Sequence, residues 1–397
     1  MPSNHRTQVA VIGGGPAGLL LGHLLHRQGI GSVVLESRSR DYVERRQRAG
    51  ILEQTTVDVL RASGAGARMD AEGLRHDGIE LRFDGRSHRI DLPALTGGRS
   101  VMVYAQTEVV KDLITLRLAA GAPLLFEAQA LAIDGTGTGE PTVRYRHGGA
   151  EHLLECDFVV ACDGFHGLGR ASMPADVLRT FDRTYPYSWL GILADVPPSC
   201  DELIYAHHPN GFALHSMRTP RISRLYLQVD PDADLADWSD ERIWDELETR
   251  FGLARDWKLH RGPITEKSIT PMRGFVAEPM RHGRLFLAGD AAHIVPPTGA
   301  KGLNLAAADV SLLAAALTRR YRDEDETQLD AYSETALRRV WRAERFSHLM
   351  TTMLHRAPGQ DPFEDRLQLA QLRYTATSTA AATALAENYV GLPFTPG

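Results

Sequence analysis

Cysteine is scarce in this chain, which has only Cys156, Cys162 and Cys200 among its 397 residues. An odd number of cysteines without the spacing of paired ligands argues against a disulfide framework and against zinc or another bound metal. Sparing use of cysteine is typical of a reducing compartment. We therefore expect a cytoplasmic protein without a metal centre.

A basic excess is also missing. The 44 lysine and arginine residues are outnumbered by 50 aspartate and glutamate residues, which gives a formal net charge of −6. A general binder of nucleic acids or membrane surfaces would carry a basic excess. The longest apolar stretch, residues 9–25, is interrupted by Gly13-Gly14-Gly15-Pro16. We therefore expect neither a nucleic-acid partner nor a membrane span.

Two kinds of hydrophobic pattern alternate along the chain. Apolar β-branched runs at 8–12, 32–35, 157–161 and 285–288 are typical of buried parallel strands, and the first two enclose a helical pattern. Short strands over 76–95 and 180–271 indicate an antiparallel sheet. Helices are predicted over 106–118, 303–320 and 332–356.

This alternation predicts interleaved domains in a mixed α/β (α+β) fold. We expect a Rossmann-like nucleotide-binding domain made of residues 1–75, 101–180 and 271–300, and an antiparallel β domain for the substrate made of residues 76–100 and 181–270. Residues 301–397 form a helical C-terminal region. The last helices offer apolar surface for subunit contacts, although such spacing is more often that of a core; the positions are Trp341, Phe346, Met350, Met353 and Leu354.

A glycine pattern stands between the first strand and the first helix. Gly13, Gly15 and Gly18 form G-x-G-x-x-G, and Glu36 ends the next strand. Glycines allow the backbone to approach a pyrophosphate, the helix N-terminus favours its charge, and the glutamate can accept ribose hydroxyls. The pattern predicts a dinucleotide site, with a plain strand-to-helix turn as the alternative.

Two aspartates follow later buried strands. Asp290 comes directly after the run at 285–288, at the edge where open α/β sheets bind ligands, so it can accept a sugar hydroxyl. A helix N-cap is the alternative for Asp290. Asp163 follows the run at 157–161, and its residues alone indicate only a turn with a polar tip.

Together and in this order, the glycine motif, the Asp163-Gly164 segment and the Gly289-Asp290 segment resemble the three fingerprints of the single-component FAD-dependent aromatic hydroxylases. The resemblance extends over essentially the whole chain through residues 46–54, 104–108, 293–306 and 386–393. It implies hydroxylation of 4-hydroxybenzoate at C3 to 3,4-dihydroxybenzoate (protocatechuate) with O2, FAD and a reduced nicotinamide, through a flavin C4a-hydroperoxide. Activity on another hydroxybenzoate, a flavin-binding protein without turnover, and an NAD-linked dehydrogenase remain alternatives.

The resemblance also implies the cofactor contacts. FAD is expected at Gly13, Gly15, Gly18, Glu36, Arg46, Gln47, Arg48, Gln106, Asp163, Arg224, Asp290, Gly302, Leu303 and Asn304. A surface groove for the nicotinamide donor is expected at Arg38, Arg46, His166 and Arg273. Ser37 departs from the NADPH-preferring pattern, but Arg38 or Arg40 can still pair with a 2′-phosphate, so we expect NADPH with NADH also used.

Substrate contacts are expected on the antiparallel sheet. Ser216 and Arg218 share one strand face, as do Arg224 and Tyr226, and arginine with nearby hydroxyls suits a carboxylate; a solvated sheet face is the alternative. By resemblance, Ser216, Arg218 and Tyr226 bind the carboxylate, and Pro297 and Thr298 lie beside the ring.

The phenol end of the substrate is assigned by resemblance to Tyr205 and Tyr389, with His76 as the terminus of a proton relay. Histidine suits that task because its ordinary pKa is near neutrality. On residue type alone, the tyrosines would be core residues and His76 would lie at the surface. A homodimer is implied by the family.

Overall fold

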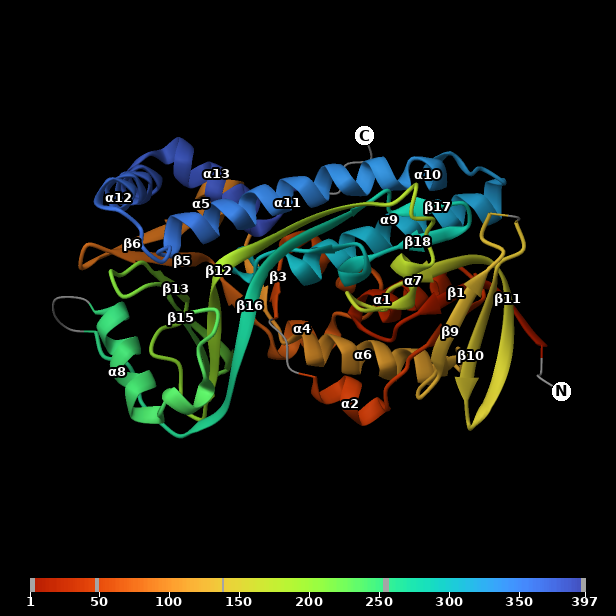
Figure 1. The fold of residues 1–397 in the computed structure, drawn as a ribbon, viewed down its shortest axis with the longest axis horizontal. Helices are drawn as coiled ribbons and strands as arrows, with labels where there is room; N and C mark the ends of the chain where they lie inside the picture. Colours follow the sequence, from red (N-terminus) through yellow and green to blue (C-terminus); the bar gives the residue numbers. More distant parts are fainter. Residues whose placement is uncertain (1–3, 47–49, 138, 253–256, 394–397) are drawn as a thin grey trace.

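The computed structural model describes residues 4–46, 50–137, 139–252 and 257–393. These residues form a mixed α/β fold with three sheets (Figure 1). The predicted fold class is confirmed. None of the helices in these ranges has the length and apolar character that a membrane-crossing helix needs.

The first sheet is built around the apolar runs that the sequence predicts as buried strands. Its spatial order is β17 (Arg281–His282), β18 (Leu285–Leu287), β11 (Ala150–Ala161), β1 (Asn4–Ile12), β2 (Ser32–Leu35) and β8 (Leu124–Leu125), with β10 (Thr142–His147) and β9 (Gln129–Asp134) following from β11. The pairs β18–β11, β11–β1 and β1–β2 are parallel. The carboxyl ends of these strands therefore meet at one edge.

The second sheet is largely antiparallel. Its order is β19 (His293–Ile294), β16 (Ile264–Glu278), β12 (Arg179–Ala194), β15 (Ile222–Val229), β14 (Ala213–Thr219), β13 (Leu203–Ala206), β5 (Gly78–Phe83) and β6 (Arg86–Asp91). The predicted strands after residue 76 thus join the predicted meander, β13–β14–β15. The long strands β12 and β16 run side by side along the molecule (Figure 1).

A third, small sheet and the helices complete the architecture. The sheet has the order β3 (Ile51–Leu52), β7 (Val101–Val103) and β4 (Leu74–His76). The helices are α1 (Pro16–Arg27), α2 (Arg40–Arg45), α3 (Gln54–Ala62), α4 (Ala67–Glu72), α5 (Leu92–Thr96), α6 (Gln106–Ala119), α7 (Leu168–Ala171), α8 (Asp240–Phe251), α9 (Gly302–Asp323), α10 (Thr327–Asp330), α11 (Tyr332–Leu354), α12 (Pro362–Thr377) and α13 (Thr379–Val390), with 3-10 turns η1 (Leu235–Asp237), η2 (Gly289–Ala291) and η3 (Pro297–Gly299).

The long helix α11 packs most of its apolar residues inside the chain. Phe346, Met350, Met353 and Leu354 are at most 3% exposed and belong to the core that also contains Tyr205 and α13, whereas Trp341 is 41% exposed. The expectation that these residues offer surface for subunit contacts is therefore wrong for all but Trp341. Their helical spacing brings them onto the face that covers the second sheet.

Candidate functional site

Three turns lie next to one another at the carboxyl edge of the first sheet. They follow β1, β11 and β18, and backbone hydrogen bonds join them: Cys162 N donates to Ile12 O at 2.7 Å, and Ala288 N donates to Ala161 O at 3.0 Å. The glycine motif and the two aspartate segments, which are far apart in the sequence, are thereby brought together. The apolar run before each turn is the feature of the sequence that predicts this edge.

The glycine turn has the shape that its composition predicts. Gly13 has φ +103°, and a Cβ there would lie 2.3 Å from Cys162 O; a Cβ on Gly18 would lie 2.0 Å from Gly13 O. Both positions therefore require glycine. By contrast, a Cβ on Gly15 would meet nothing within 4 Å, so open space lies before the N-terminus of α1. That terminus has no side-chain cap, which leaves its N–H groups available to an anion.

Glu36 is buried at the end of β2 and is held by backbone groups. Its Oε2 accepts from Gly14 N at 2.7 Å, and its Oε1 accepts from Arg38 N at 2.7 Å. A carboxylate has about four lone-pair positions, so these bonds orient it and leave capacity for ribose hydroxyls.

Asp290 and Asp163 take different positions. Asp290 lies exposed in η2 beside the glycine turn. The Asp163 carboxylate instead packs beneath its own loop, where Oδ2 accepts from Gly169 N at 2.8 Å, and burial raises its pKa. Asp163 therefore shapes the turn before α7.

The segment from Pro297 to Asn304 closes the site from the side of α9. The side-chain amide of Asn304 donates to Ile51 O at 2.9 Å and Ala300 O at 2.8 Å, while its Oδ1 accepts from Glu53 N at 2.9 Å. The amide thus ties this segment to the start of α3. Gly302, Leu303 and Asn304 form the first turn of α9, so their N–H groups point toward the site.

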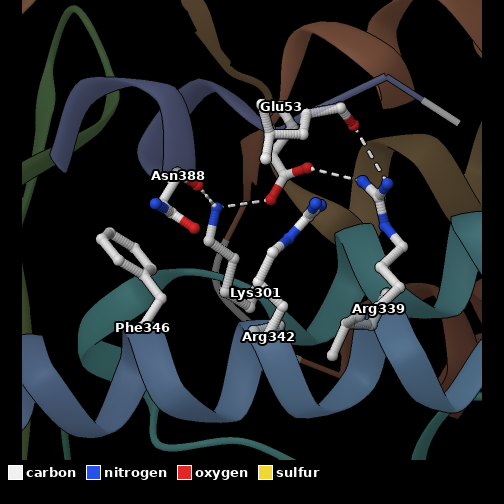
Figure 2. A pocket seen from close by; sticks show the side chains of 10 residues that line it. Glu53, Lys301, Arg339, Arg342, Phe346 and Asn388 are labelled. Atoms are coloured by element: carbon white, nitrogen blue, oxygen red, sulfur yellow. Dashed lines mark hydrogen bonds and ion pairs between the residues drawn. The ribbon is translucent and has the colours of Figure 1, made fainter. Parts of the chain in front are cut away.

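A buried charged cluster, which the sequence analysis missed, supports the same segment. Lys301 Nζ donates to Glu53 Oε1 at 2.5 Å and to the carbonyl oxygen of Asn388, and Arg339 Nη2 donates to Glu53 Oε2 at 3.2 Å (Figure 2). Lys301 Nζ also donates to the carbonyl oxygen of Tyr389. Burial lowers the pKa of Lys301, while Glu53 opposes that shift. The cluster fixes the segment against the end of α13, which carries Tyr389.

A cavity lies between the second sheet and the Pro297 segment. It contains about 550 Å³ of empty space, part of it open to solvent. Its lining residues are Gly50, Ile51, Val103, Ala105, Trp189, Tyr205, Leu214, Ser216, Met217, Arg218, Arg224, Tyr226, Pro297 and Ala300. None of these described residues is acidic, so the two arginines favour an anionic ligand.

The carboxylate-binding group expected from the sequence lines this cavity together. Register pairs Ser216 with Arg224 and Leu214 with Tyr226 across β14 and β15. Arg218 Nη2 donates to Thr107 Oγ1 at 2.9 Å, and Arg224 donates to the hydroxyl of Tyr226. Burial lowers the pKa of Arg218, and the charge of Arg224 lowers it further. A bound carboxylate would relieve that repulsion.

Tyr205 and Tyr389 form a hydrogen-bonded pair at the cavity wall. Their hydroxyl oxygens are 2.8 Å apart, and both side chains are buried. Burial raises the pKa of both phenols, so both stay protonated near neutral pH. Only Tyr205 lines the cavity, and Tyr389 lies behind it.

Thr298 does not line the cavity, and His76 does not lie at the surface. Thr298 is absent from the cavity lining, and its hydroxyl accepts from Thr351 Oγ1 at 2.9 Å. His76 pairs with Val101 in the small sheet and is only 1% exposed, so the surface position suggested by its residue type is wrong. Burial lowers its pKa to about 4, and its ring nitrogens have no hydrogen-bond partner among the described residues.

Comparison with known proteins assigns the family. The model of the FAD binding domain family matches residues 6–347. The p-hydroxybenzoate hydroxylase of Acinetobacter baylyi is 51% identical over 389 residues, which cover 98% of this chain and 96% of that protein. This chain belongs to the FAD-dependent aromatic hydroxylases.

More distant proteins agree with that assignment. The 6-methylpretetramide 4-monooxygenase of Streptomyces rimosus is 28% identical to this chain, and the match covers 88% of this chain and 84% of that protein. The crystal structure of p-nitrophenol 4-monooxygenase from Pseudomonas putida superposes with a TM-score of 0.84 at 21% identity, covering 98% and 100% of the two chains. This last likeness concerns the fold.

The hydroxylase binds FAD, and its residues fit that cofactor. The open space before α1 suits a pyrophosphate, and the oriented Glu36 suits a ribose. Gln106 is half-buried at the first position of α6. Gln47 and Arg48, also expected at FAD, lie outside the described residues.

Two of the residues expected to bind the nicotinamide donor, Arg273 and His166, both lie against Phe165. The guanidinium of Arg273 lies 4.3 Å from the ring centre of Phe165, whose ring is 4.9 Å from that of the exposed His166. Arg273 Nε also donates to Asp182 at 2.8 Å. Arg46 is exposed after α2, and Arg38 is exposed with its guanidinium 5.4 Å from the ring centre of Tyr42.

Proposed function

We propose that the hydroxylase inserts one oxygen atom of O2 at C3 of 4-hydroxybenzoate, giving 3,4-dihydroxybenzoate. The proposal rests on one observation: Tyr205 lines the same cavity as Ser216, Arg218 and Tyr226. The 51% identical relative named p-hydroxybenzoate hydroxylase supports it.

The spacing of these groups suits a para-substituted ring. Tyr205 pairs with Leu214 across β13 and β14, and Ser216 lies two residues further along β14. Two residues of a strand span about 7 Å. A benzene ring with oxygen at one end and a carboxylate at the other bridges such a distance. Trp189, Leu214 and Met217 provide apolar walls for the ring.

Each end of the substrate then has a defined role for the chain. Arg218, Ser216 and Tyr226 hold the carboxylate by charge-assisted hydrogen bonds. The substrate phenol donates to Tyr205, which passes a proton to Tyr389. Because both tyrosines resist ionisation, the proton moves along the hydrogen bonds as the substrate becomes a phenolate. The phenolate makes the carbon beside it electron-rich. His76 is the proposed end of the relay, although no described residue forms a hydrogen bond with its ring nitrogens and burial lowers its pKa to about 4.

The remaining site residues place the cofactor and exclude water. Bound FAD supplies the redox chemistry, taking two electrons from a reduced nicotinamide and using O2 as the oxygen source. Gly13, Gly15, Gly18 and Glu36 hold its adenosine half, and Gln106 and Asp290 hold the ribityl chain. The N–H groups in the first turn of α9 would face the flavin ring, and Pro297 lines the cavity. Arg224, which also lines the cavity, would contact the flavin.

The electron donor is proposed as NADPH, with NADH also accepted. Arg38, Arg46, His166 and Arg273 line its groove. The exposed Arg38 is placed beside the ribose-binding Glu36, where a guanidinium can pair with a 2′-phosphate. Turnover with each donor checks this preference, and a clear preference for NADH would contradict it.

A cytoplasmic homodimer is the proposed form of the enzyme. The three cysteines are free, as in proteins of reducing compartments. An apolar stripe on α12 provides a surface for a second copy: Phe363 is 70%, Leu367 50% and Tyr374 56% exposed, at helical spacing.

The first experiment measures oxidation of the reduced nicotinamide with and without 4-hydroxybenzoate and quantifies products by chromatography. Stimulation with one 3,4-dihydroxybenzoate per donor oxidised supports the proposal. Stimulation without that product, or no stimulation, would contradict it. Other hydroxybenzoates assayed in parallel would identify a different substrate of the same cavity.

A further inference from the structure

One carboxylate oxygen of α9 contacts two residues of the segment that follows β18. Asp309 Oδ2, on α9, accepts from Gly289 N at 2.9 Å and lies 2.6 Å from His293 Nε2. The side chains of His293 and Asp309 are 1% and 2% exposed. These contacts connect α9 with both ends of the turn that carries Asp290.

The contact with Asp309 favours the charged form of the histidine. Burial lowers the pKa of His293, but the charge and hydrogen bond of Asp309 outweigh burial, and the pKa lies above its ordinary value. A buried imidazolium paired with a carboxylate makes a stronger hydrogen bond than two neutral groups. The Asp309 side chain is therefore firmly oriented toward Gly289.

The Gly289–Asp290 turn is packed closely against its neighbours. Gly289 has φ +61°, and a Cβ there would lie 3.3 Å from Ala306 and 3.4 Å from Ala17, so the turn is fitted between α9 and α1. Asp290 projects into solvent from this turn, whereas the backbone on either side is anchored. Arg170 Nη1 adds a bond to Ala291 O at 2.8 Å.

We propose that Asp309 and His293 are positioning residues for FAD: together they hold the Gly289–Asp290 turn in the conformation that receives the ribityl chain. This inference rests on the placement of Asp290 at the ribityl chain in the proposed function. Asp309 lies on α9, whose first turn is placed at the flavin ring in the proposed function. The pair therefore keeps the ribityl-binding turn and the ring-binding helix terminus in one fixed relation.

This positioning role predicts that changes at Asp309 affect binding of the flavin half of FAD and not binding of its ADP half. In the proposed function ADP would contact the glycine turn and Glu36, whereas FAD would also contact the Asp290 turn. Loss of the oriented charge at Asp309 should therefore weaken binding of FAD and leave binding of ADP unchanged. General damage to the nucleotide-binding sheet would weaken both ligands alike.

The test uses apoprotein of the full chain with Asp309→Asn, and measures Kd for FAD by flavin fluorescence and Kd for ADP by calorimetry. We expect Kd for FAD to rise about tenfold, the effect of losing one charge-assisted hydrogen bond, and Kd for ADP to stay within about twofold. Asp323→Asn, an exposed carboxylate on the same helix, is the matched control and should change neither constant.

His293→Gln provides a second variant in case Asp309→Asn does not fold, and should show the same selective loss. An unchanged Kd for FAD, or parallel weakening of FAD and ADP, would overturn the proposal. Because no substrate is present, failure of the wild-type enzyme to hydroxylate 4-hydroxybenzoate would leave this test intact and contradict only the proposed function.

Discussion

At the scale of single residues, the hydroxyl of Tyr205 is the feature on which the proposed chemistry depends. It combines exposure to the cavity with a hydrogen bond to a second buried phenol. Neither property alone would move a proton away from a bound ring. In the proposed function, the pair provides both an acceptor for the substrate proton and an acceptor beyond it.

Replacing this hydroxyl separates binding from hydroxylation. Tyr205→Phe should keep FAD bound but slow hydroxylation about 10²-fold and release reducing equivalents as peroxide, since the substrate phenol loses its proton acceptor. Product and peroxide per donor oxidised measure the effect. Tyr187→Phe, a buried tyrosine outside the cavity lining, is the control. Tight coupling in Tyr205→Phe would refute the assigned role.

The guanidinium of Arg218 is expected to recognise the carboxylate by its planar fork. Arg218→Lys keeps the charge but loses paired donors, so Kd for 4-hydroxybenzoate should rise about tenfold. Titration of the flavin spectrum measures this constant, with the exposed Arg221→Lys as the control. Equal weakening of 4-hydroxybenzaldehyde, which has no carboxylate, would contradict the assignment.

At the scale of elements, α11 introduces a carboxyl group that titrates near neutral pH. Glu344 faces β16, a backbone hydrogen bond from Phe275 reaches it, and His293 lies close enough to interact electrostatically. Burial raises the pKa of Glu344 to about 7, against the opposing effects of His293 and Phe275. Its Oε1 has no hydrogen-bond partner among the described residues.

This raised pKa makes stability fall with rising pH. The folded state binds the Glu344 proton more tightly than the unfolded state, so the contribution is present below the unfolded pKa and lost as pH rises to about 7. Between pH 5 and 8 the loss from this group is about 3 kcal/mol. Glu344→Gln should remove that loss, as measured by urea unfolding at both pH values.

The control for this prediction is Glu334→Gln, an exposed glutamate on the same helix, which should keep the wild-type pH dependence. A Glu344→Gln variant whose free energy of unfolding changes with pH as the wild type does would contradict the raised pKa.

At the scale of the whole molecule, β12 and β16 connect the two large sheets. These strands pair from Arg179 and Glu278 to Ala194 and Ile264, and so run through the expected domain limits at 180 and 271. The division into three regions stays a prediction. The cavity lies where the Pro297 segment meets the second sheet, so the strands also set its dimensions.

The proposed dimer is tested through the stripe on α12. Phe363→Ser combined with Leu367→Ser removes apolar area that a partner would cover, so sedimentation should shift from a dimer to a single chain of 43.7 kDa. Leu118→Ser, an exposed leucine on α6, is the control. A wild-type protein that sediments as a monomer, or an unchanged dimer in the double variant, would contradict the proposal.

The sequence by itself determined the features that depend on neighbouring residues. The buried strands before each turn, the glycine turn, the helix from Gln106 and the alternation on β14 and β15 all follow from local spacing, because backbone geometry repeats over two to four residues. The order of the three motifs added the resemblance to a family. The comparison with known proteins confirms that family.

Only the tertiary structure decided which distant side chains meet. Tyr205 and Tyr389 are 184 positions apart, and Lys301 and Glu53 are 248 apart, yet each pair forms a hydrogen bond. No periodicity connects such residues, since their meeting depends on how sheets and helices pack. The same reason hid the burial of His76, and it hid Asp309, whose proposed role follows from its contact with a turn 20 residues earlier.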